Sequence, residues 1–250
     1  KSTQKVDFKI LKQGLNISDP FREIKPVILQ NYQWHNAKTN IQPSFLNNSE
    51  IVYEFEDKTI QFNSGNEYRY FTFHNLEILS ERIEQFDFRH PYYFIRLFAD
   101  ESNLFKSYSS TNKDENGKYV IRTRRMDAKD YDVIEADYCL IHFRLNYDVP
   151  VDNANVYLFG EISNYEIDDK YKLKYNLETR AYETVLLLKQ GYYNYRYLLV
   201  HDSPTNKIDH GFFEGSHFET ENDYQIFIYY REPGRNFDRL VSYKKINSRN

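Results

Sequence analysis

The sequence predicts an all-β protein, on the evidence of its aromatic content, the spacing of its aromatic residues and the scarcity of helix-forming blocks. Tyrosine and phenylalanine account for 24 and 19 of the 250 residues. In one stretch Tyr193, Tyr195, Tyr197 and Leu199 occupy every second position. This period places them on one face of an extended chain. Aromatic rings suit a half-buried pleated surface, so we expect sheets throughout.

Strand candidates follow one another at short intervals with turn residues between them, a spacing typical of β-sandwiches. In chain order they are residues 6–11, 25–31, 51–55, 68–74, 91–98, 104–109, 119–123, 138–145, 156–159, 171–176, 182–188, 192–200, 224–230 and 239–244. Residues 77–86 stay open between helix and strand, because Leu79, Ile83 and Phe86 fit one helical face only loosely.

Two turns have explicit chemistry. Asn116-Gly117 lies between the candidates at 104–109 and 119–123, and both residues tolerate the positive φ of a tight hairpin. Gly191 ends a short connection between the candidates at 182–188 and 192–200. We expect Gly191 to adopt the left-handed conformation there.

The chain length suits two domains of about 100–150 residues each. The acidic, apolar-poor stretch 126–136 is the expected boundary, and Cys139, Ile141, Phe143 and Leu145 then alternate as a new sandwich would. We therefore predict two tandem β-sandwich domains, residues 1–130 and 131–250.

The bulk properties exclude several functional classes. The formal net charge of −4 predicts no nucleic-acid partner. No apolar stretch approaches the roughly 20 residues of a membrane-spanning helix. The single cysteine, Cys139, excludes an internal disulfide framework. The chain begins at Lys1 without an apolar leader, so we take it as a mature or trimmed sequence.

Local spacing offers little catalytic chemistry. The seven histidines show no metal-ligand spacing, and we find neither a nucleophile elbow nor a phosphate-binding loop. Glu219 and Glu221 alternate along the chain and could form a carboxylate pair. Like charges at a strand edge more often lie in a turn or face solvent. We predict a non-catalytic protein without metal or cofactor.

Six ordered segments resemble a known family. They are LQNYQWHNA at 29–37, GNEYRYF at 65–71, QGYYNYRY at 190–197, FETENDY at 218–224, YYR at 229–231 and FDRL at 237–240. Together they resemble the family of uncharacterised-domain proteins that includes the type IX secretion system plug protein. The resemblance implies a periplasmic or outer-membrane-associated protein that docks on an outer-membrane translocon barrel and occludes its periplasmic opening.

The C-terminal half carries a second resemblance. Residues 156–160 and 163–165, followed by QGYYNYRY, are similar to the glycogen-binding immunoglobulin-like modules. This similarity implies an immunoglobulin-like fold for residues 131–250 and a role for Tyr165 in stacking on glucose rings. The alternative function is therefore a carbohydrate-binding module protein that recognises glycans through exposed aromatic residues.

The family segments also predict structural contacts. Glu67 and Glu221 follow turn-forming residues, and carboxylates can bind arginines or unpaired turn N–H groups. We expect Glu67, Glu219 or Glu221 to do so, with Arg69, Arg231 and Arg239 as natural partners. The complete set of predicted motif residues is Gly65, Asn66, Glu67, Arg69, Gly191, Glu219, Glu221, Asn222, Arg231, Asp238 and Arg239.

Overall fold

The computed structural model describes residues 2–54, 58–76, 80–109, 114–123, 134, 136–204 and 207–249. The named elements of this part are strands, apart from the α-helical turn α1 (Pro20–Glu23) and two 3-10 turns, η1 (Glu161–Ser163) and η2 (Asp169–Tyr171). Among the described helices, none is long and apolar enough to cross a membrane.

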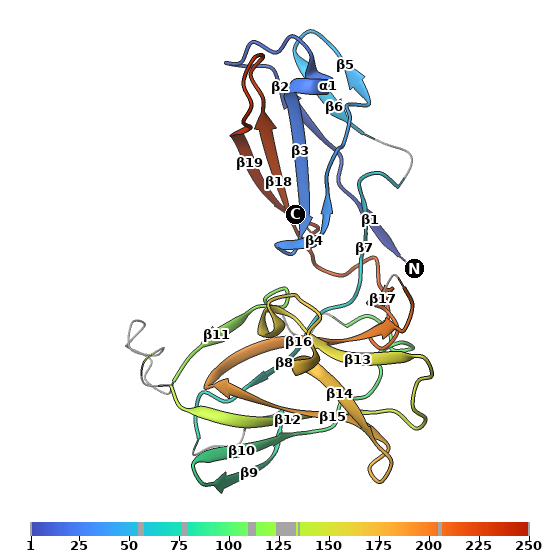
Figure 1. Cartoon of the computed structure of the whole chain (residues 1–250), viewed down its shortest axis with the longest axis vertical. Coiled ribbons are helices and arrows are strands. Elements are labelled where there is room, and N and C mark those ends of the chain that lie inside the picture. Colours follow the sequence, from blue (N-terminus) through green and yellow to red (C-terminus); the bar gives the residue numbers. More distant parts are fainter. Residues whose placement is uncertain are drawn as a thin grey trace. The chain divides into compact units, whose positions relative to one another are not determined.

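The described chain divides into two compact units (Figure 1). One unit, here called the inserted unit because it interrupts the sequence of the other, is contiguous and spans Gly65–Gly215. The discontinuous unit combines Lys1–Ser64 with Ser216–Asn250. Each unit has its own cluster of buried apolar side chains, as expected of separate folding units.

The discontinuous unit contains two larger sheets and a short strand pair. The four-stranded sheet has the order β19 (Arg239–Asn247), β18 (Asp223–Tyr230), β3 (Ile24–Gln30) and β4 (Gln33–Lys38). The three-stranded sheet has the order β2 (Phe8–Leu11), β6 (Glu50–Tyr53) and β5 (Phe45–Leu46). The short pair consists of β1 (Thr3–Lys5) and β7 (Gln61–Asn63). Ile28, Ile226 and Ile228 from one sheet share a core with Ile51 and Tyr53 from the other. This arrangement is consistent with a β-sandwich.

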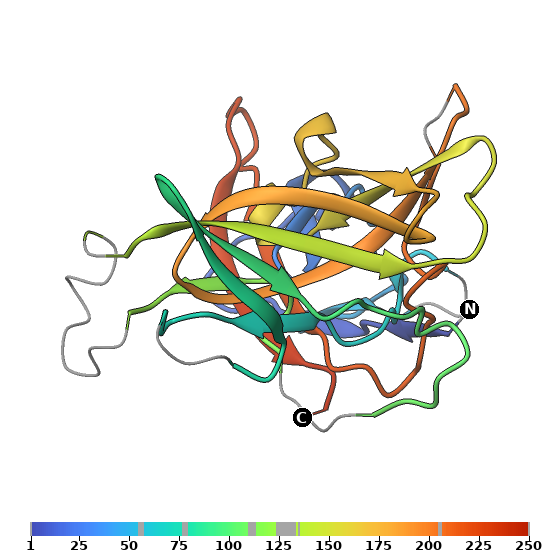
Figure 2. The ribbon, with the colours of Figure 1, turned by 90° about the horizontal axis from the view of Figure 1, so that it is seen from below.

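One ten-stranded, nearly closed sheet forms the inserted unit (Figure 2). Its strands are β8 (Arg69–Thr72), β9 (Ile83–Arg89), β10 (Tyr92–Leu97), β11 (Tyr119–Ile121), β12 (Tyr138–Asn146), β13 (Ala154–Phe159), β14 (Lys172–Asn176), β15 (Ala181–Lys189), β16 (Gly191–His201) and β17 (Ile208–Asp209). The main path is β11-β16-β13-β14-β15-β12-β10-β9, and β8 and β17 also pair with β16. The long strand β16 thus holds four partners.

Aromatic rings fill the core of the inserted unit. Tyr193, Tyr195 and Tyr197 project from one face of β16 and are almost fully buried, which confirms the predicted alternation. Phe71 on the paired strand β8 stacks on Tyr193 with ring centroids 5.3 Å apart, and Phe143 meets Tyr195 edge-on at 5.2 Å. Such contacts stabilise aromatic cores beyond simple area burial.

The predicted domain boundary is wrong. Asp130 and its neighbours lie outside the described residues, but the strands on either side belong to one sheet. Strands β10 and β12 pair in parallel, with Tyr93 opposite Cys139. The acidic stretch therefore connects two strands of one unit, and residues 216–250 belong with the N-terminal segment instead. The predicted tandem arrangement is replaced by an insertion.

Most predicted strands are confirmed, but residues 104–109 differ, and strands β1, β4, β5, β7 and β17 were not predicted. Residues 104–109 form no strand, because Lys106 N–H closes a turn onto the Asn103 carbonyl and Phe105 is 96% exposed. Of the open segment 77–86, residues 77–79 lie outside the described part, and residues 83–86 begin strand β9. Strand β4 was not predicted, since its sequence QWHNAK lacks a strong apolar alternation.

The two predicted turns have different outcomes. Asn116 and Gly117 both have positive φ, at 54° and 89°, as predicted. Gly191 is not among the described residues with positive φ, and β15 and β16 are not neighbours in the sheet. Glycine is needed at position 191 for another reason, because the backbone of Val120 comes very close to it: a Cβ atom on residue 191 would lie 2.4 Å from the Val120 carbonyl oxygen.

Candidate functional site

The predicted motif residues divide between the two units. Gly65, Asn66, Glu67, Arg69 and Gly191 lie in the inserted unit, and Glu219, Glu221, Asn222, Arg231, Asp238 and Arg239 lie in the discontinuous unit. Within each unit, distant family segments meet. Residues 65–71 pair with 190–197 through β8 and β16, and residues 29–31 meet 222–224 through β3 and β18.

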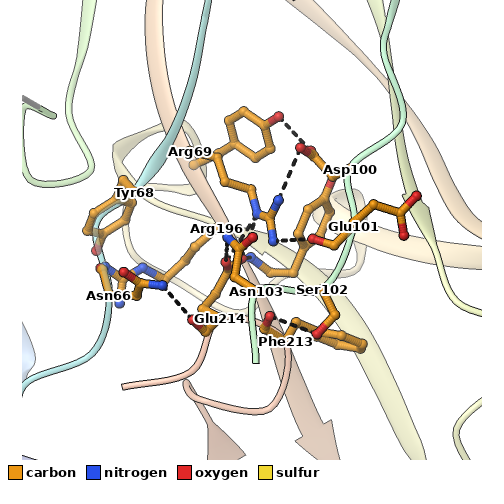
Figure 3. A network of polar contacts seen from close by, with 12 residues as sticks. Asn66, Tyr68, Arg69, Asp100, Glu101, Ser102, Asn103, Arg196, Phe213 and Glu214 are labelled. Carbon is orange, nitrogen blue, oxygen red and sulfur yellow. Dashed lines mark hydrogen bonds and ion pairs between the residues drawn. The ribbon is translucent and has the colours of Figure 1, made fainter. Parts of the chain in front are cut away.

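Arg69 is the centre of the polar network in the inserted unit (Figure 3). Its side chain, on strand β8, is only 9% exposed. The Nε atom donates to Glu214 at 2.9 Å, Nη1 donates to Asp100 at 3.1 Å, and Nη2 donates to the Glu101 carbonyl at 2.8 Å. Burial alone would lower the pKa of Arg69, but the two carboxylates outweigh it and hold the pKa above its ordinary value.

Asp100 follows strand β10 and accepts four side-chain hydrogen bonds. Its Oδ1 accepts from Arg69 and, at 2.6 Å, from Arg82. Its Oδ2 accepts from the hydroxyls of Tyr195 at 2.7 Å and Tyr197 at 2.9 Å. Burial, followed by the nearby Asp100 carboxylate, raises the pKa of both tyrosines well above the ordinary value. Both phenols therefore remain neutral donors at pH 7.

Glu214 closes the network near the end of the inserted unit. Its side chain is 1% exposed and accepts from Arg69, from the Tyr197 N–H at 2.9 Å and from the Asn103 amide at 3.2 Å. The Glu214 carbonyl accepts from the side chain of Asn66 at 2.7 Å. This bond holds the beginning and the end of the inserted unit together.

The network is suited to holding structure rather than to acid–base chemistry. The carboxylates of Asp100 and Glu214 are both bound by Arg69 and by further internal donors. General acid–base catalysis needs a carboxyl that can exchange a proton with substrate. Here the accepting positions are taken by this protein's own groups. The network instead joins strands β8 and β16 to the segments that carry Asp100 and Glu214.

A cavity of about 550 Å³ lies over this network. Its lining combines three cations, Arg69, Arg82 and Lys106, with several carboxylates; the acidic residues are Glu67, Glu81, Asp100 and Glu101. The size falls within the range of small-ligand pockets. The mixed charge of the lining does not favour one class of ligand over another.

Glu67 and its neighbours form a second polar group in the same unit. The Glu67 carboxylate accepts from the Tyr108 hydroxyl rather than from Arg69. Asp114 accepts from the backbone N–H groups of Tyr68 and Asn116. Burial raises the pKa of Asp114 to about 7, and the Glu67 carboxylate adds to this increase.

Asn222 is the centre of a buried amide cluster in the discontinuous unit. Its Nδ2 donates to Gln4 Oε1 and to the Ser64 carbonyl, both at 2.9 Å. Its Oδ1 accepts from Asn31 Nδ2 at 2.8 Å, and Tyr224 donates its hydroxyl to Gln4 at 2.7 Å. The predicted turn residue therefore ties together β1, the end of β3 and the start of β18.

The remaining motif carboxylates and arginines of this unit lie near the surface. Glu221 forms an ion pair with Arg249 at 3.4 Å, and the exposed residue Glu219 accepts from Arg249 through its backbone carbonyl. Arg231 binds Asp238 through two hydrogen bonds, at 2.6 and 2.9 Å. Arg239 lies over the Tyr230 ring, 6.0 Å from its centroid. In the described part of the chain, the predicted partners Arg231 and Arg239 thus bind other residues, and the arginine that contacts Glu219 and Glu221 is Arg249, which was not predicted.

Tyr165 does not offer an open stacking face. The residue is half-buried, and its hydroxyl points to the Asn116 carbonyl at 3.4 Å. Its ring meets Phe159 edge-on, and Phe159 is itself only 1% exposed. A sugar-binding platform needs flat exposed rings, so this geometry does not favour glucose stacking at Tyr165.

The sequence did not identify Asp100 and Glu214 as the partners of Arg69. One signal was available, because buried tyrosine hydroxyls need hydrogen-bond partners and Tyr195 and Tyr197 were predicted to share one face. That reasoning indicates a buried acceptor but not its position in the chain. Among the described residues, no group of three or more His, Cys, Asp or Glu residues could hold a metal ion.

Comparison with known proteins shows a similarity to a solved structure. The chain matches no protein-family model and no curated protein. It is similar to a hypothetical protein from Parabacteroides merdae whose crystal structure has been solved, with a TM-score of 0.89 and 35% sequence identity. The match covers 99% of this chain and 60% of that chain. This chain thus spans 60% of the length of its structural relative.

Proposed function

We propose that this protein is a non-catalytic component of the bacterial cell envelope that docks on an outer-membrane translocon barrel and occludes its periplasmic opening. The six ordered segments that resemble the type IX secretion system plug family carry this proposal. We also propose a periplasmic or outer-membrane-associated location on the same ground. The partner is the translocon protein.

The polar network supports a docking role through the segment that it anchors. Arg69 binds the Glu101 carbonyl, and the Ser102 hydroxyl and the Asn103 N–H both donate to the Phe213 carbonyl, at 3.1 and 2.7 Å. The next residues expose large apolar side chains, and Phe105 is 96% exposed. An exposed aromatic side chain on a well-held segment loses little conformational entropy on binding.

We also propose that part of the fold is immunoglobulin-like. It applies to strands β12 to β16 of the inserted unit, where β12–β15 and β13–β16 pair antiparallel around one core. The glycan-binding alternative depends on Tyr165, whose ring is half-buried. We therefore retain the docking role.

Affinity purification from a host that makes the complete type IX secretion machine tests the proposal. We expect the translocon protein to co-purify with the tagged chain. Phe105→Ser should reduce co-purification at least several-fold. Leu177→Ser is the matched control, because Leu177 is 80% exposed in the turn between β14 and β15 and lies far along the chain from this segment.

Each outcome has a distinct meaning. If the wild-type chain does not associate with the translocon protein in such a host, the docking role is wrong. If it associates and Phe105→Ser associates equally well, the docking surface lies elsewhere. Calorimetry with α-glucans serves as a separate check, and heat abolished by Tyr165→Ala would favour the glycan-binding alternative.

A further inference from the structure

The discontinuous unit contains an apolar groove of about 670 Å³ between strands β2 and β19. Strands β2, β18 and β19 can be followed in Figure 1. We call this feature the β2–β19 groove. Its apolar lining includes Ile10, Leu15, Ile17, Ile226, Ile228 and Val241. Strands β2 and β19 are the terminal strands of their sheets in the described part of the chain, so the sandwich is open here.

The charged residues that line the groove are all cationic. They are Lys9, Arg239 and Lys244, and no acidic side chain belongs to the described lining. Lys9 is paired with Glu50 at 3.1 Å. Lys244 lies opposite Ile226 in the β18–β19 register. Cross-strand partners project to the same face, so Lys244 shares the inner face with a buried isoleucine.

The edges of the groove are poorly suited to accept another strand. Strand β2 has only four residues, and β19 has a register shift between Ile228 and Tyr229 of its partner. Short edge strands, bulges and inward-facing lysines are the features by which sheets discourage edge-to-edge pairing. A flexible apolar chain does not require backbone pairing, so these features do not exclude it.

We propose that the β2–β19 groove binds a medium- or long-chain fatty acid, with the alkyl chain against the isoleucine lining and the carboxylate beside Lys244 and Arg239. A concave, mainly apolar site with a few placed polar groups is typical of small-ligand binding. The positive charges of Lys244 and Arg239 at the rim select an anionic head group over a neutral or cationic one. The inference goes beyond the proposed docking role and does not depend on it.

Isothermal titration calorimetry with dodecanoate and tetradecanoate, below their micelle concentrations, tests the proposal. We expect saturable binding at one site. The affinity should rise with chain length, by up to about fourfold for each added CH₂ group. Dodecyltrimethylammonium, with a similar chain and a cationic head group, should bind at least tenfold more weakly.

Variants locate the binding site. Ser242 lies in the groove lining and is exposed, so Ser242→Trp should fill the groove without disturbing the core and should abolish binding. Lys244→Gln should weaken dodecanoate binding several-fold, and Lys244→Arg should restore it. Lys174→Gln is the matched control, because Lys174 is exposed on β14 of the inserted unit. Circular dichroism verifies that each variant is folded.

Several results would overturn the proposal. It is wrong if dodecanoate produces no saturable heat, if Ser242→Trp binds as the wild type does, or if the cationic amphiphile binds equally well. Light scattering distinguishes another occupant: if the protein self-associates without fatty acid and Ser242→Trp abolishes that association, a second copy occupies the groove. Capture of an extended peptide in place of fatty acid would likewise contradict the proposal.

Discussion

The side-chain amide of Asn31 donates to the side-chain oxygen of Asn222 at 2.8 Å, although 191 positions separate the two residues. The Asn31 oxygen in turn accepts from the Asp223 N–H at 2.8 Å. Both asparagines are almost fully buried, at 4% and 3% exposure. A predicted turn motif near the C-terminus therefore acts by fastening the N-terminal segment.

Replacing Asn222 by alanine should destabilise the discontinuous unit by about 3 kcal/mol, since buried partners such as Asn31 and Gln4 would lose a hydrogen bond. Urea unfolding followed by tryptophan fluorescence measures the change, because Trp34, the one tryptophan in the sequence, lies in this unit. Thr3→Ala is the control in the same unit: its side-chain bond to Gln61 is exposed, so its effect should stay within about 0.5 kcal/mol. Equal effects of the two changes would contradict the assignment.

The Arg69–Glu214 pair should be sensitive to removal of one charge. Glu214→Gln keeps the shape of the side chain but leaves Arg69 buried with less compensation, so we expect a loss of about 3 kcal/mol in the unfolding free energy. Asp238→Asn weakens the exposed pair with Arg231 and should change stability by less than about 1 kcal/mol. Urea unfolding followed by circular dichroism distinguishes them. Comparable losses would show that burial of the network does not matter.

Asp114 should make stability pH-dependent. Its folded-state pKa of about 7 lies above its ordinary value of 3.8, so the folded protein binds the proton more tightly than the unfolded chain. The resulting stabilisation is complete below the ordinary pKa and is lost as the pH rises through 7. We expect a decrease of about 2–3 kcal/mol between pH 5 and pH 8.

Asp114→Asn keeps this side chain neutral at every pH and should remove that part of the pH dependence. Urea unfolding at pH 5 and pH 8 gives, for each protein, the change in unfolding free energy between the two pH values, and the two changes are then compared. Other titrating groups cancel in the comparison. Parallel pH profiles for the two proteins would mean that Asp114 titrates normally.

Gly191→Ala should destabilise the inserted unit by about 1–3 kcal/mol, because the new Cβ would clash with the Val120 carbonyl oxygen. Gly211→Ala is the matched change in the same unit. Its Cβ would have 3.5 Å to the nearest atom, the Gly215 carbonyl oxygen, and its φ is not in the left-handed range, so we expect a near-neutral effect. Thermal unfolding followed by circular dichroism compares them. A Gly191→Ala protein as stable as wild type would refute the close-approach explanation.

Local patterns predicted local features of this molecule. The alternation of Tyr193, Tyr195 and Tyr197 identified a buried strand face correctly, because side-chain direction in a strand follows from a period of two. The positive φ of Asn116 and Gly117 was likewise predictable from residue type alone.

Features that depend on distant contacts were not predictable in the same way. The acidic stretch around Asp130 resembled a linker by composition, yet the strands before and after it, β11 and β12, belong to one sheet, in which Tyr93 of β10 lies opposite Cys139 of β12. The partners of Arg69 were also missed, since Asp100 and Glu214 follow different strands and converge only in the folded unit. Sequence spacing contains no direct signal for such convergence.

The insertion of one unit within the other also has a consequence for synthesis on the ribosome. Strands β18 and β19 supply half of the four-stranded sheet, so β3 and β4 emerge long before their partners have been translated. The inserted unit has all of its strands once residue 215 has left the exit tunnel. Domains fold as units while the chain grows. We therefore expect the inserted unit to form its native core first, whereas the N-terminal strands β3 and β4 complete their sheet only after β18 and β19 have been translated.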